Sequence, residues 1–381
     1  MKILMISLDK GLLGKGELGD VTSRHRQYGN FVDQLDIIVF SRRGYKKNKI
    51  SERVFAYPTN SVSKFFYFFN ACQIGKKLFK IQKYDLIVTQ APFVTGLAGY
   101  FLSRKFKTKL LVHYHGDYVK NKLWLKEKWY NFLLLQISGF ISKRADGVRV
   151  MSRSIKDKLV ESGIDGKKIR VISTPVSLVK FGNWDADFSR RLKEKYNQKK
   201  ILLFVGRLSQ EKDLLTLLKA LLEVKETYPN FILLVIGEGN EKLSWMDWTE
   251  KNGLMSNVEF IGQLSHEDLV NYYAVSEFLV NSSTSESFGK IFVEAAACAK
   301  TSVATATTGA REIITDGKTG LLSPIKDSHA LSLNILKLLR DEQTAKKMGE
   351  EARNSASKRF DGGVNTQEII NFWQDLVRDR F

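Results

Sequence analysis

The chain has 381 residues, of which 43% are hydrophobic and 27% charged, a composition typical of a globular protein with room for two cores. Its two cysteines, Cys72 and Cys298, lie far apart in the sequence, which argues against a disulfide framework or a zinc site. No segment resembles a secretory signal or reaches the apolar length of a membrane-spanning helix, so we expect a cytoplasmic protein.

The formal net charge of +19 is distributed unevenly. Residues 1–180 contain 34 Lys and Arg against 13 Asp and Glu, a net charge of +21, whereas residues 181–381 contain 26 against 28, a net charge of −2. A basic half of this kind usually contacts an anionic partner, such as nucleic acid, phospholipid head groups or an acidic substrate. The alternative is a lysine-rich solvated surface.

Short apolar runs alternate with helix-length amphipathic segments over the first 180 residues. The runs are apolar almost throughout, which is typical of parallel strands that helices cover on both faces. We therefore predict a doubly wound, Rossmann-like domain over residues 1–180. Its predicted strands are 2–8, 36–41, 53–57, 85–90, 109–115, 147–152 and 169–173.

The sequence GKGELG at residues 14–19 matches G-x-G-x-x-G. In a nicotinamide-binding domain the first glycine follows the strand almost at once, but here residues 9–13 intervene. An NADP-dependent oxidoreductase that uses this loop, with arginines at 42–43 beyond the second strand, stays open as an alternative. A longer glycine loop would instead let the backbone approach donor phosphates, and Gly16 and Gly19 are the candidates for that contact.

Two stretches of the basic half, 63–80 and 120–135, mix aromatic and basic residues at helical spacing. This pattern is found in helices that rest on an anionic membrane surface. We interpret most of the phenylalanines as core residues and expect the flanking lysines, Trp124 and Trp129 to be exposed. A basic nucleic-acid-binding protein is the competing class, although no RNA- or DNA-binding motif is present and we expect no nucleic-acid partner.

The strand pattern stops at residues 181–199, which we predict to be a linker, and resumes in a second Rossmann-like domain over residues 200–363. Residues 364–381 form an amphipathic segment that we expect to pack back on the first domain as a helix. The predicted strands of the second domain are 200–206, 231–237, 257–262, 277–282 and 301–306. Open α/β sheets bind ligands at the carboxyl ends of their strands, where helix N-termini meet phosphates.

Two motifs of the second domain carry charged residues in suitable positions. GRLSQEKD follows strand 200–206, and its Arg207 and Lys212 form a strong anion site beside a helix start. SSTSESFGKIFVE places Glu286 in a loop and Glu294 about two helical turns further on, since one turn takes ~3.6 residues. We expect the backbone amides between the two carboxylates to face phosphate groups. These amides belong to Ser287, Phe288 and Gly289.

These motifs, with the run EAAACAKTSVATATTGAREIITDGKTGLLS, resemble the C-terminal half of the family four retaining glycosyltransferases, which use nucleotide sugars and have the GT-B fold. The resemblance implies two doubly wound domains facing across a cleft. It also implies that Arg207 and Lys212 bind the donor diphosphate, Glu294 the nucleotide ribose, and Glu286 the hydroxyls of the donor sugar.

The first domain carries a segment, VHYHGDY, that is similar to the family's acceptor side. The resemblance implies that His115 hydrogen-bonds the transferring sugar and that Asp117 orients an acceptor hydroxyl. His113 lies on the opposite face of the strand and is interpreted as packing, whereas His25 is expected to be solvated.

Some positions depart from the family pattern. Residues 298–301, Cys-Ala-Lys-Thr, stand where members often have Cys-Gly-x-Pro, and Thr308-Gly309 stands where a pair of glycines is common. Lys290 is also unusual within the motif of the two glutamates. The loss of Gly and Pro changes loop geometry and deletes no charged group, so the reaction class is unaffected.

From these observations we predict a retaining, metal-independent hexosyltransferase without a cofactor. Its substrate would be a nucleotide-diphosphate sugar, with UDP favoured over GDP from the frequency of each in the family. Its acceptor would be a saccharide or a lipid-linked molecule, in cell-surface polysaccharide or glycolipid synthesis. Asp185 and Asp187 have the spacing of an Asp-x-Asp metal site but lie in the predicted linker. The basic domain suggests a peripheral position on the inner face of the cell membrane.

Overall fold

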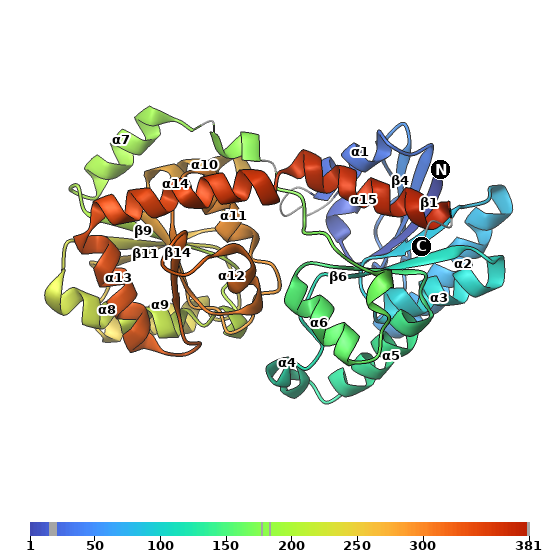
Figure 1. Cartoon of the computed structure of the whole chain (residues 1–381), viewed down its shortest axis with the longest axis horizontal. Helices are drawn as coiled ribbons and strands as arrows, with labels where there is room; N and C mark the ends of the chain where they lie inside the picture. The colour runs from blue at the N-terminus through green and yellow to red at the C-terminus, as the bar shows by residue number, and fades with distance from the viewer. Residues whose placement is uncertain (15–20, 177, 183, 379–381) are drawn as a thin grey trace. The chain divides into compact units, whose positions relative to one another are not determined.

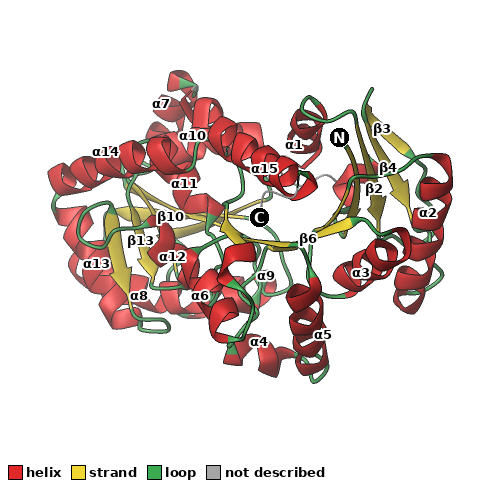
Figure 2. Cartoon of the chain, turned by 45° about the vertical axis from the view of Figure 1, so that its right-hand side comes forward, coloured by secondary structure: helices red, strands yellow, loops and turns green. Residues whose placement is uncertain are grey.

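The computed structural model describes residues 1–14, 21–176, 178–182 and 184–378. The chain divides into two compact units (Figure 1). Unit 1 contains Met1–Ser173 together with Gly363–Phe381, and unit 2 contains Thr174–Gly362. In each unit helices flank a largely parallel sheet (Figure 2), so the predicted fold class of two doubly wound, Rossmann-like domains is confirmed. Across the described part of the chain, every helix is too short or too polar to cross a membrane.

The sheet of unit 1 has eight strands within the described residues, and all neighbouring pairs are parallel except the first two along the sheet. In spatial order they are β3 (Asn48–Ser51), β4 (Val54–Pro58), β2 (Gln34–Val39), β1 (Lys2–Ser7), β5 (Leu86–Thr89), β6 (Lys109–Tyr114), β7 (Gly147–Val150) and β8 (Ile169–Val171). The order along the sheet reverses between β1 and β5. The antiparallel strand β3 was not predicted, because its sequence NKIS has no apolar run.

The helices of unit 1 include the last helix of the chain. They are α1 (Val21–Gly29), α2 (Tyr67–Ile81), α3 (Val94–Phe106), α4 (Lys122–Glu127), α5 (Asn131–Arg144), α6 (Arg153–Glu161) and α15 (Gly362–Val377). Helix α15 buries Ile370 and Trp373 completely in the same cluster as Ile3 and Met5 of β1. The rings of Trp373 and Tyr28 of α1 meet edge to face at 5.4 Å. Unit 1 is therefore built from two separate stretches of sequence.

The sheet of unit 2 has six strands in the described part of the chain, and all neighbouring pairs are parallel. In spatial order they are β11 (Val258–Gly262), β10 (Phe231–Ile236), β9 (Lys200–Val205), β12 (Phe278–Asn281), β13 (Ser302–Thr305) and β14 (Gly320–Ser323). All six residues of β10, FILLVI, are buried, as expected for a strand covered on both faces. The strand order reverses between β9 and β12, and this switch point is where open α/β sheets bind ligands.

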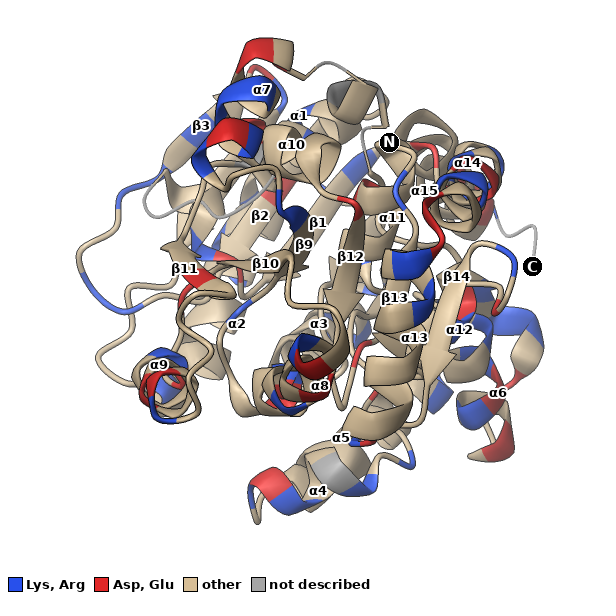
Figure 3. Ribbon diagram, turned by 90° about the vertical axis from the view of Figure 1, so that its left-hand side faces the viewer, with Lys and Arg blue, Asp and Glu red and all other residues tan. Residues whose placement is uncertain are grey.

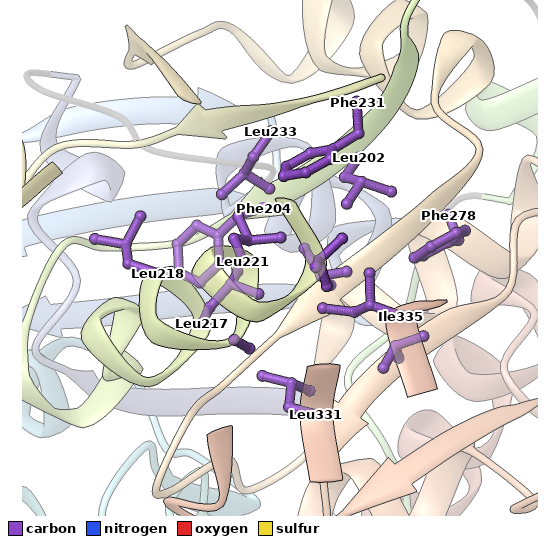
Figure 4. Packing of buried hydrophobic residues seen from close by; sticks show 14 of the residues in the cluster. Leu202, Phe204, Leu217, Leu218, Leu221, Phe231, Leu233, Phe278, Leu331 and Ile335 are labelled. Atoms are coloured by element: carbon purple, nitrogen blue, oxygen red, sulfur yellow. The ribbon is translucent and has the colours of Figure 1, made fainter. Parts of the chain in front are cut away.

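Helices pack on both faces of this sheet. They are α7 (Ala186–Lys195), α8 (Leu214–Thr227), α9 (Lys242–Lys251), α10 (His266–Val275), α11 (Lys290–Ala297), α12 (Thr308–Ile313), α13 (Ser328–Arg340) and α14 (Glu342–Arg359). Figure 4 shows Leu217 and Leu221 of α8 with Phe204 of β9 and Leu331 of α13 in one buried cluster. Their apolar side chains are removed from water together, which is the main favourable term in folding this unit.

Residues 181–199 were predicted as a linker, but the structure assigns them to unit 2. The segment forms α7, which contacts α10, and the rings of Phe188 and Tyr272 meet at 5.2 Å. Asp185 begins this helix as its N-cap, because its carboxylate accepts hydrogen bonds from the backbone amides of Asp187 and Phe188. The Asp-x-Asp spacing is thus explained by a helix start.

Candidate active site

Loops that follow β9 and β12 meet at the switch point of unit 2. The hydroxyl of Ser282 donates to the backbone oxygen of Asp213 at 2.8 Å. The backbone amide of Thr284 donates to the backbone oxygen of Glu211, also at 2.8 Å. The two loops that carry the predicted donor-binding residues are therefore fixed to each other by hydrogen bonds.

These contacts bring Lys212 and Glu286 together. Lys212 Nζ donates to Glu286 Oε2 at 2.5 Å, and the two side chains are 14% and 17% exposed. An ammonium group has three N–H donors, so two remain for an anionic ligand after the bond to Glu286. Arg207 lies two residues beyond the end of β9 and has an exposed side chain. The sequence prediction placed these residues at one site, and the structure joins Lys212 to Glu286 directly.

The segment between the two glutamates turns sharply into α11. Gly289, the N-cap residue, has φ +81° and ψ 55°, a left-handed conformation that glycine adopts readily. A Cβ at this position would lie 2.4 Å from the ring of Phe292. The first backbone N–H groups of a helix point out from its N-terminus and bind anions. This turn therefore places the N–H donors of α11 at the carboxyl edge of the sheet.

A second glycine fixes the same segment from the other side. The backbone amide of Gly309 donates to the backbone oxygen of Glu286 at 2.6 Å. A Cβ at Gly309 would lie 2.6 Å from the carbonyl carbon of Phe288, which is itself buried next to Phe360. Close backbone contact therefore requires glycine at position 309. The first glycine of the pair that is common in the family is replaced here by Thr308.

Glu294 is buried in α11, with 4% of its surface exposed. The hydroxyl of Tyr273 donates to Glu294 Oε2 at 3.0 Å, and Lys290 Nζ lies 3.5 Å from Glu294 Oε1. Burial, together with the adjacent carboxylate, raises the pKa of Tyr273 well above its usual value, so its hydroxyl keeps its proton as a donor. Sequence reasoning missed Tyr273, because it lies inside the helical pattern of α10.

The loops after β9 and β10 touch through their backbones. Gly237 has φ +142°, and a Cβ there would lie 1.9 Å from the backbone oxygen of Gly206. At Gly239 a Cβ would lie 2.2 Å from the backbone oxygen of Leu208. No side chain fits at either position without moving the loop that leads to Arg207. The sequence GEG after a predicted strand was the available signal for this contact.

His115 lies at the carboxyl edge of the sheet in unit 1. It follows β6 and has an exposed side chain, whose Nε2–H donates to Gln90 Oε1 at 2.6 Å. Gln90 follows β5, the strand at which the order of this sheet reverses. The predicted histidine is thus held at a switch-point edge, and Gln90 is a partner that the sequence did not reveal.

Asp117 is more enclosed than its predicted role suggests. Its side chain is 7% exposed, and its Oδ2 accepts a bond from Lys158 Nζ of α6 at 2.6 Å. An acceptor hydroxyl would have to bind Asp117 beside Lys158, which already occupies one carboxylate oxygen. Gly16 and Gly19, the predicted phosphate-loop residues, lie outside the described residues.

The two remaining histidines of this unit are both buried. His113 is 1% exposed, in agreement with its interpretation as packing. His25 was expected to be solvated, but this is wrong: it is 3% exposed, and its Nδ1–H donates to the backbone oxygen of Val21 at 2.7 Å. Helix α1 turns the imidazole toward Tyr28, whose ring it meets at 5.4 Å. Among the described residues, no group of three or more His, Cys, Asp or Glu could hold a metal ion.

Comparison with known proteins identifies the family of this chain and agrees with the fold. Residues 185–355 match the family model of glycosyl transferases group 1, and residues 32–180 match that of glycosyltransferase family 4. The chain is 28% identical over 306 residues to an uncharacterized glycosyltransferase of Methanocaldococcus jannaschii, covering 79% of this chain and 77% of that protein. It is 25% identical over 331 residues to alpha-monoglucosyldiacylglycerol synthase of Streptococcus pneumoniae, covering 82% and 72%.

A solved structure supports the same conclusion for the fold. Anabaena HepE in complex with UDP-glucose has a TM-score of 0.81 with this chain at 19% identity, covering 98% of this chain and 100% of that one. The two Rossmann-like units and this likeness identify the GT-B fold. The chain belongs to the family four GT-B glycosyltransferases. Sugar transfer is therefore its activity, in preference to the nicotinamide and nucleic-acid alternatives.

Proposed function

We propose that this glycosyltransferase moves a hexose from a nucleotide-diphosphate sugar to a saccharide or lipid-linked acceptor, with retention of the anomeric configuration and without a metal ion. The observation that carries the proposal is the Lys212–Glu286 ion pair, which lies on loops at the switch point of unit 2. Lys212 suits a diphosphate and Glu286 suits sugar hydroxyls. The loops that carry them are joined by hydrogen bonds.

The leaving diphosphate gains negative charge as its bond to the sugar breaks. Arg207 and Lys212 supply fixed positive charge for it, and the first amides of α11 supply N–H donors. Preorganised cations of this kind can replace the divalent metal that many transferases use. The proposed metal independence rests on these groups.

The two glutamates divide the rest of the donor between them. In the proposal Glu286 accepts hydrogen bonds from hydroxyls of the sugar, close to the cation that holds the phosphates. Glu294 accepts hydrogen bonds from the ribose diol at the carboxylate that Tyr273 and Lys290 already hold in place. A buried carboxylate that receives donors in this way discriminates strongly against ligands that lack the hydroxyl.

Indications of the individual substrates come from relatives. The HepE structures contain UDP or UDP-glucose, which supports UDP over GDP for this chain. The name of the S. pneumoniae relative, alpha-monoglucosyldiacylglycerol synthase, supports a glycolipid product, and polysaccharide synthesis is the other branch of the proposal. On the acceptor side we assign His115 to the transferring sugar and Asp117 to an acceptor hydroxyl.

The test is slow hydrolysis of a panel of UDP- and GDP-sugars by the full chain, with and without a chelator, followed by NMR of the released sugar. We expect a UDP-hexose to be consumed at the same rate in chelator and the first-formed sugar to have the anomeric configuration of the donor. An inverted sugar would contradict retention. Activity that stops in chelator and returns with a divalent metal would contradict metal independence.

A further inference from the structure

Unit 1 exposes phenylalanines that the sequence pattern assigned to the core. Phe65 is 89% exposed, and Phe66 and Phe69 are 52% and 64% exposed. They lie on the short 3-10 helix Lys64–Phe66 and the start of α2, with Trp129 88% exposed further along the chain. Large aromatic side chains left in water at this density usually mark an interaction surface.

The exposed rings continue over neighbouring helices. The ring of Phe68 contacts the rings of Phe69 at 5.3 Å and of Phe101 of α3 at 6.2 Å. Next to Phe101, Tyr100 contacts Phe140 of α5 at 5.4 Å. Helix α3 contacts both α2 and α5 (Figure 1). We call the exposed members of this set the aromatic surface. It consists of Phe65, Phe66, Phe69, Phe101 and Phe140.

Cations lie directly on this surface, and the helices that carry it contain no acidic residue. Lys76 Nζ lies 5.1 Å from the ring centre of Phe101, and the Arg144 guanidinium lies 3.8 Å from that of Phe140. Asp and Glu are absent from residues 53–84, 86–116 and 128–145. The helices of unit 2 differ, since α7, α8 and α9 each carry both signs of charge (Figure 3).

We propose that the aromatic surface docks on an anionic lipid bilayer. Aromatic rings are favourable at the boundary between head groups and acyl chains, and Lys and Arg beside them attract anionic head groups. A second copy of the chain fits less well, because a two-fold contact would bring the same cations opposite each other. The proposal goes beyond the reaction: it concerns where the enzyme works and does not require the proposed donor or mechanism.

Vesicle co-sedimentation of the full chain tests the proposal. Vesicles of phosphatidylcholine alone are compared with vesicles that also contain phosphatidylglycerol. We expect binding to the anionic vesicles only, weakened by added salt. The double substitution Phe65→Ser with Phe69→Ser should weaken it by roughly tenfold or more, since each ring loses apolar burial. Leu243→Ser is the control, because Leu243 is 78% exposed in unit 2.

A pair of charge-reversal substitutions tests the electrostatic part of the docking proposal. Lys64→Glu with Lys105→Glu should weaken binding about tenfold or more, because each cation near the lipid surface attracts anionic head groups. The exposed Lys219→Glu in unit 2 should have no effect. Lys212→Ala should bind vesicles like the wild type, which separates this proposal from the reaction mechanism.

Four results would overturn the docking proposal. The first is equal binding to uncharged vesicles, and the second is vesicle binding that neither set of substitutions changes. The third is preferential binding of an oligonucleotide competitor at equal salt. The fourth is a protein that does not bind vesicles but forms a dimer, which Phe65→Ser with Phe69→Ser dissociates.

Discussion

Tyr273 of α10 holds the buried carboxylate of Glu294 in α11 with a 3.0 Å hydrogen bond to Oε2. Both side chains are almost completely buried, so neither can exchange this bond for one to bulk water. The hydroxyl therefore fixes the direction of the carboxylate, together with Lys290, whose Nζ lies 3.5 Å from Oε1. Tyr273 acts through Glu294 and is a positioning residue.

Tyr273→Phe removes this hydroxyl and leaves the ring in place. We expect the affinity for free UDP to fall by about tenfold, since a hydrogen bond to a charged group contributes on the order of 1.5 to 3 kcal/mol. Calorimetry with UDP and 2′-deoxy-UDP measures this. If Tyr273 acts through the ribose contact, the substitution reduces the preference for UDP over its deoxy analogue. Tyr272→Phe is the matched control, and an unchanged preference would refute the positioning role.

The two glutamates should respond differently to Gln substitution. Glu294→Gln should weaken donor and free nucleotide diphosphate alike, because the ribose is common to both. Glu286→Gln should lower transfer, because its contact with the donor requires an attached sugar. It should not weaken nucleotide diphosphate binding, because the substitution also releases Lys212 from its ion pair. Calorimetric binding and steady-state transfer are measured on both variants. If Glu286→Gln weakens nucleotide binding as much as Glu294→Gln does, the assignment of one carboxylate to each part of the donor is wrong.

Removing either cation of the diphosphate site should slow the reaction. Arg207→Ala or Lys212→Ala leaves the developing negative charge without a partner, and we expect turnover to fall on the order of 100-fold or more. For Lys212→Ala the loss includes the freed carboxylate of Glu286, which would repel the donor phosphates. Lys219→Ala, an exposed lysine of α8, controls for charge. Near-normal turnover in both variants would remove the main support for the mechanism.

His113 predicts a dependence of stability on pH. Burial, with Arg149 and His115 nearby, holds the pKa of His113 well below its usual value. Above a pH of about 6.5 the ring is neutral in both folded and unfolded chains, but below it only the unfolded chain binds the proton. Stability should therefore fall as the pH falls, by up to about 1.4 kcal/mol for each pH unit from this group.

His113→Leu should remove that contribution. Urea unfolding at pH 7.5 and 5.5 gives the free energy of unfolding of both proteins. We expect the wild type to lose about 1 kcal/mol more than the variant between the two pH values. An equal loss in both proteins would show that His113 does not titrate on unfolding.

Much of the fold could be predicted because buried parallel strands have a simple signature. The run KILLFVG became β9 and FILLVIG became β10, each within a residue of its predicted end. β3 and β14 were missed, because short polar or isolated strands depend on their neighbours more than on their own sequence. Residues 181–199 were misread for a related reason: a polar surface helix resembles a linker until its contact with α10 is known.

The candidate site was predictable in its charged residues and not in their partners. Lys212 and Glu286 belong to local motifs, whereas the contact of Tyr273 with Glu294 joins two helices through tertiary packing. The exposed rings of the aromatic surface show a different error of prediction. Most phenylalanines of residues 63–80 were interpreted as core residues, but Phe65 and Phe69 are exposed. Hydrophobicity does not distinguish a residue that packs inside the protein from one that contacts a partner outside it.

The division of unit 1 into two stretches of sequence affects the order in which the protein matures during synthesis. Trp373 and Ile370 complete the core around β1, yet the ribosome makes them only after unit 2. A nascent chain that has already finished unit 2 still carries an N-terminal unit with an open apolar face. We therefore expect unit 2 to fold first, against the usual N-to-C direction, and unit 1 to become protease-resistant only after residues 363–381 leave the ribosome.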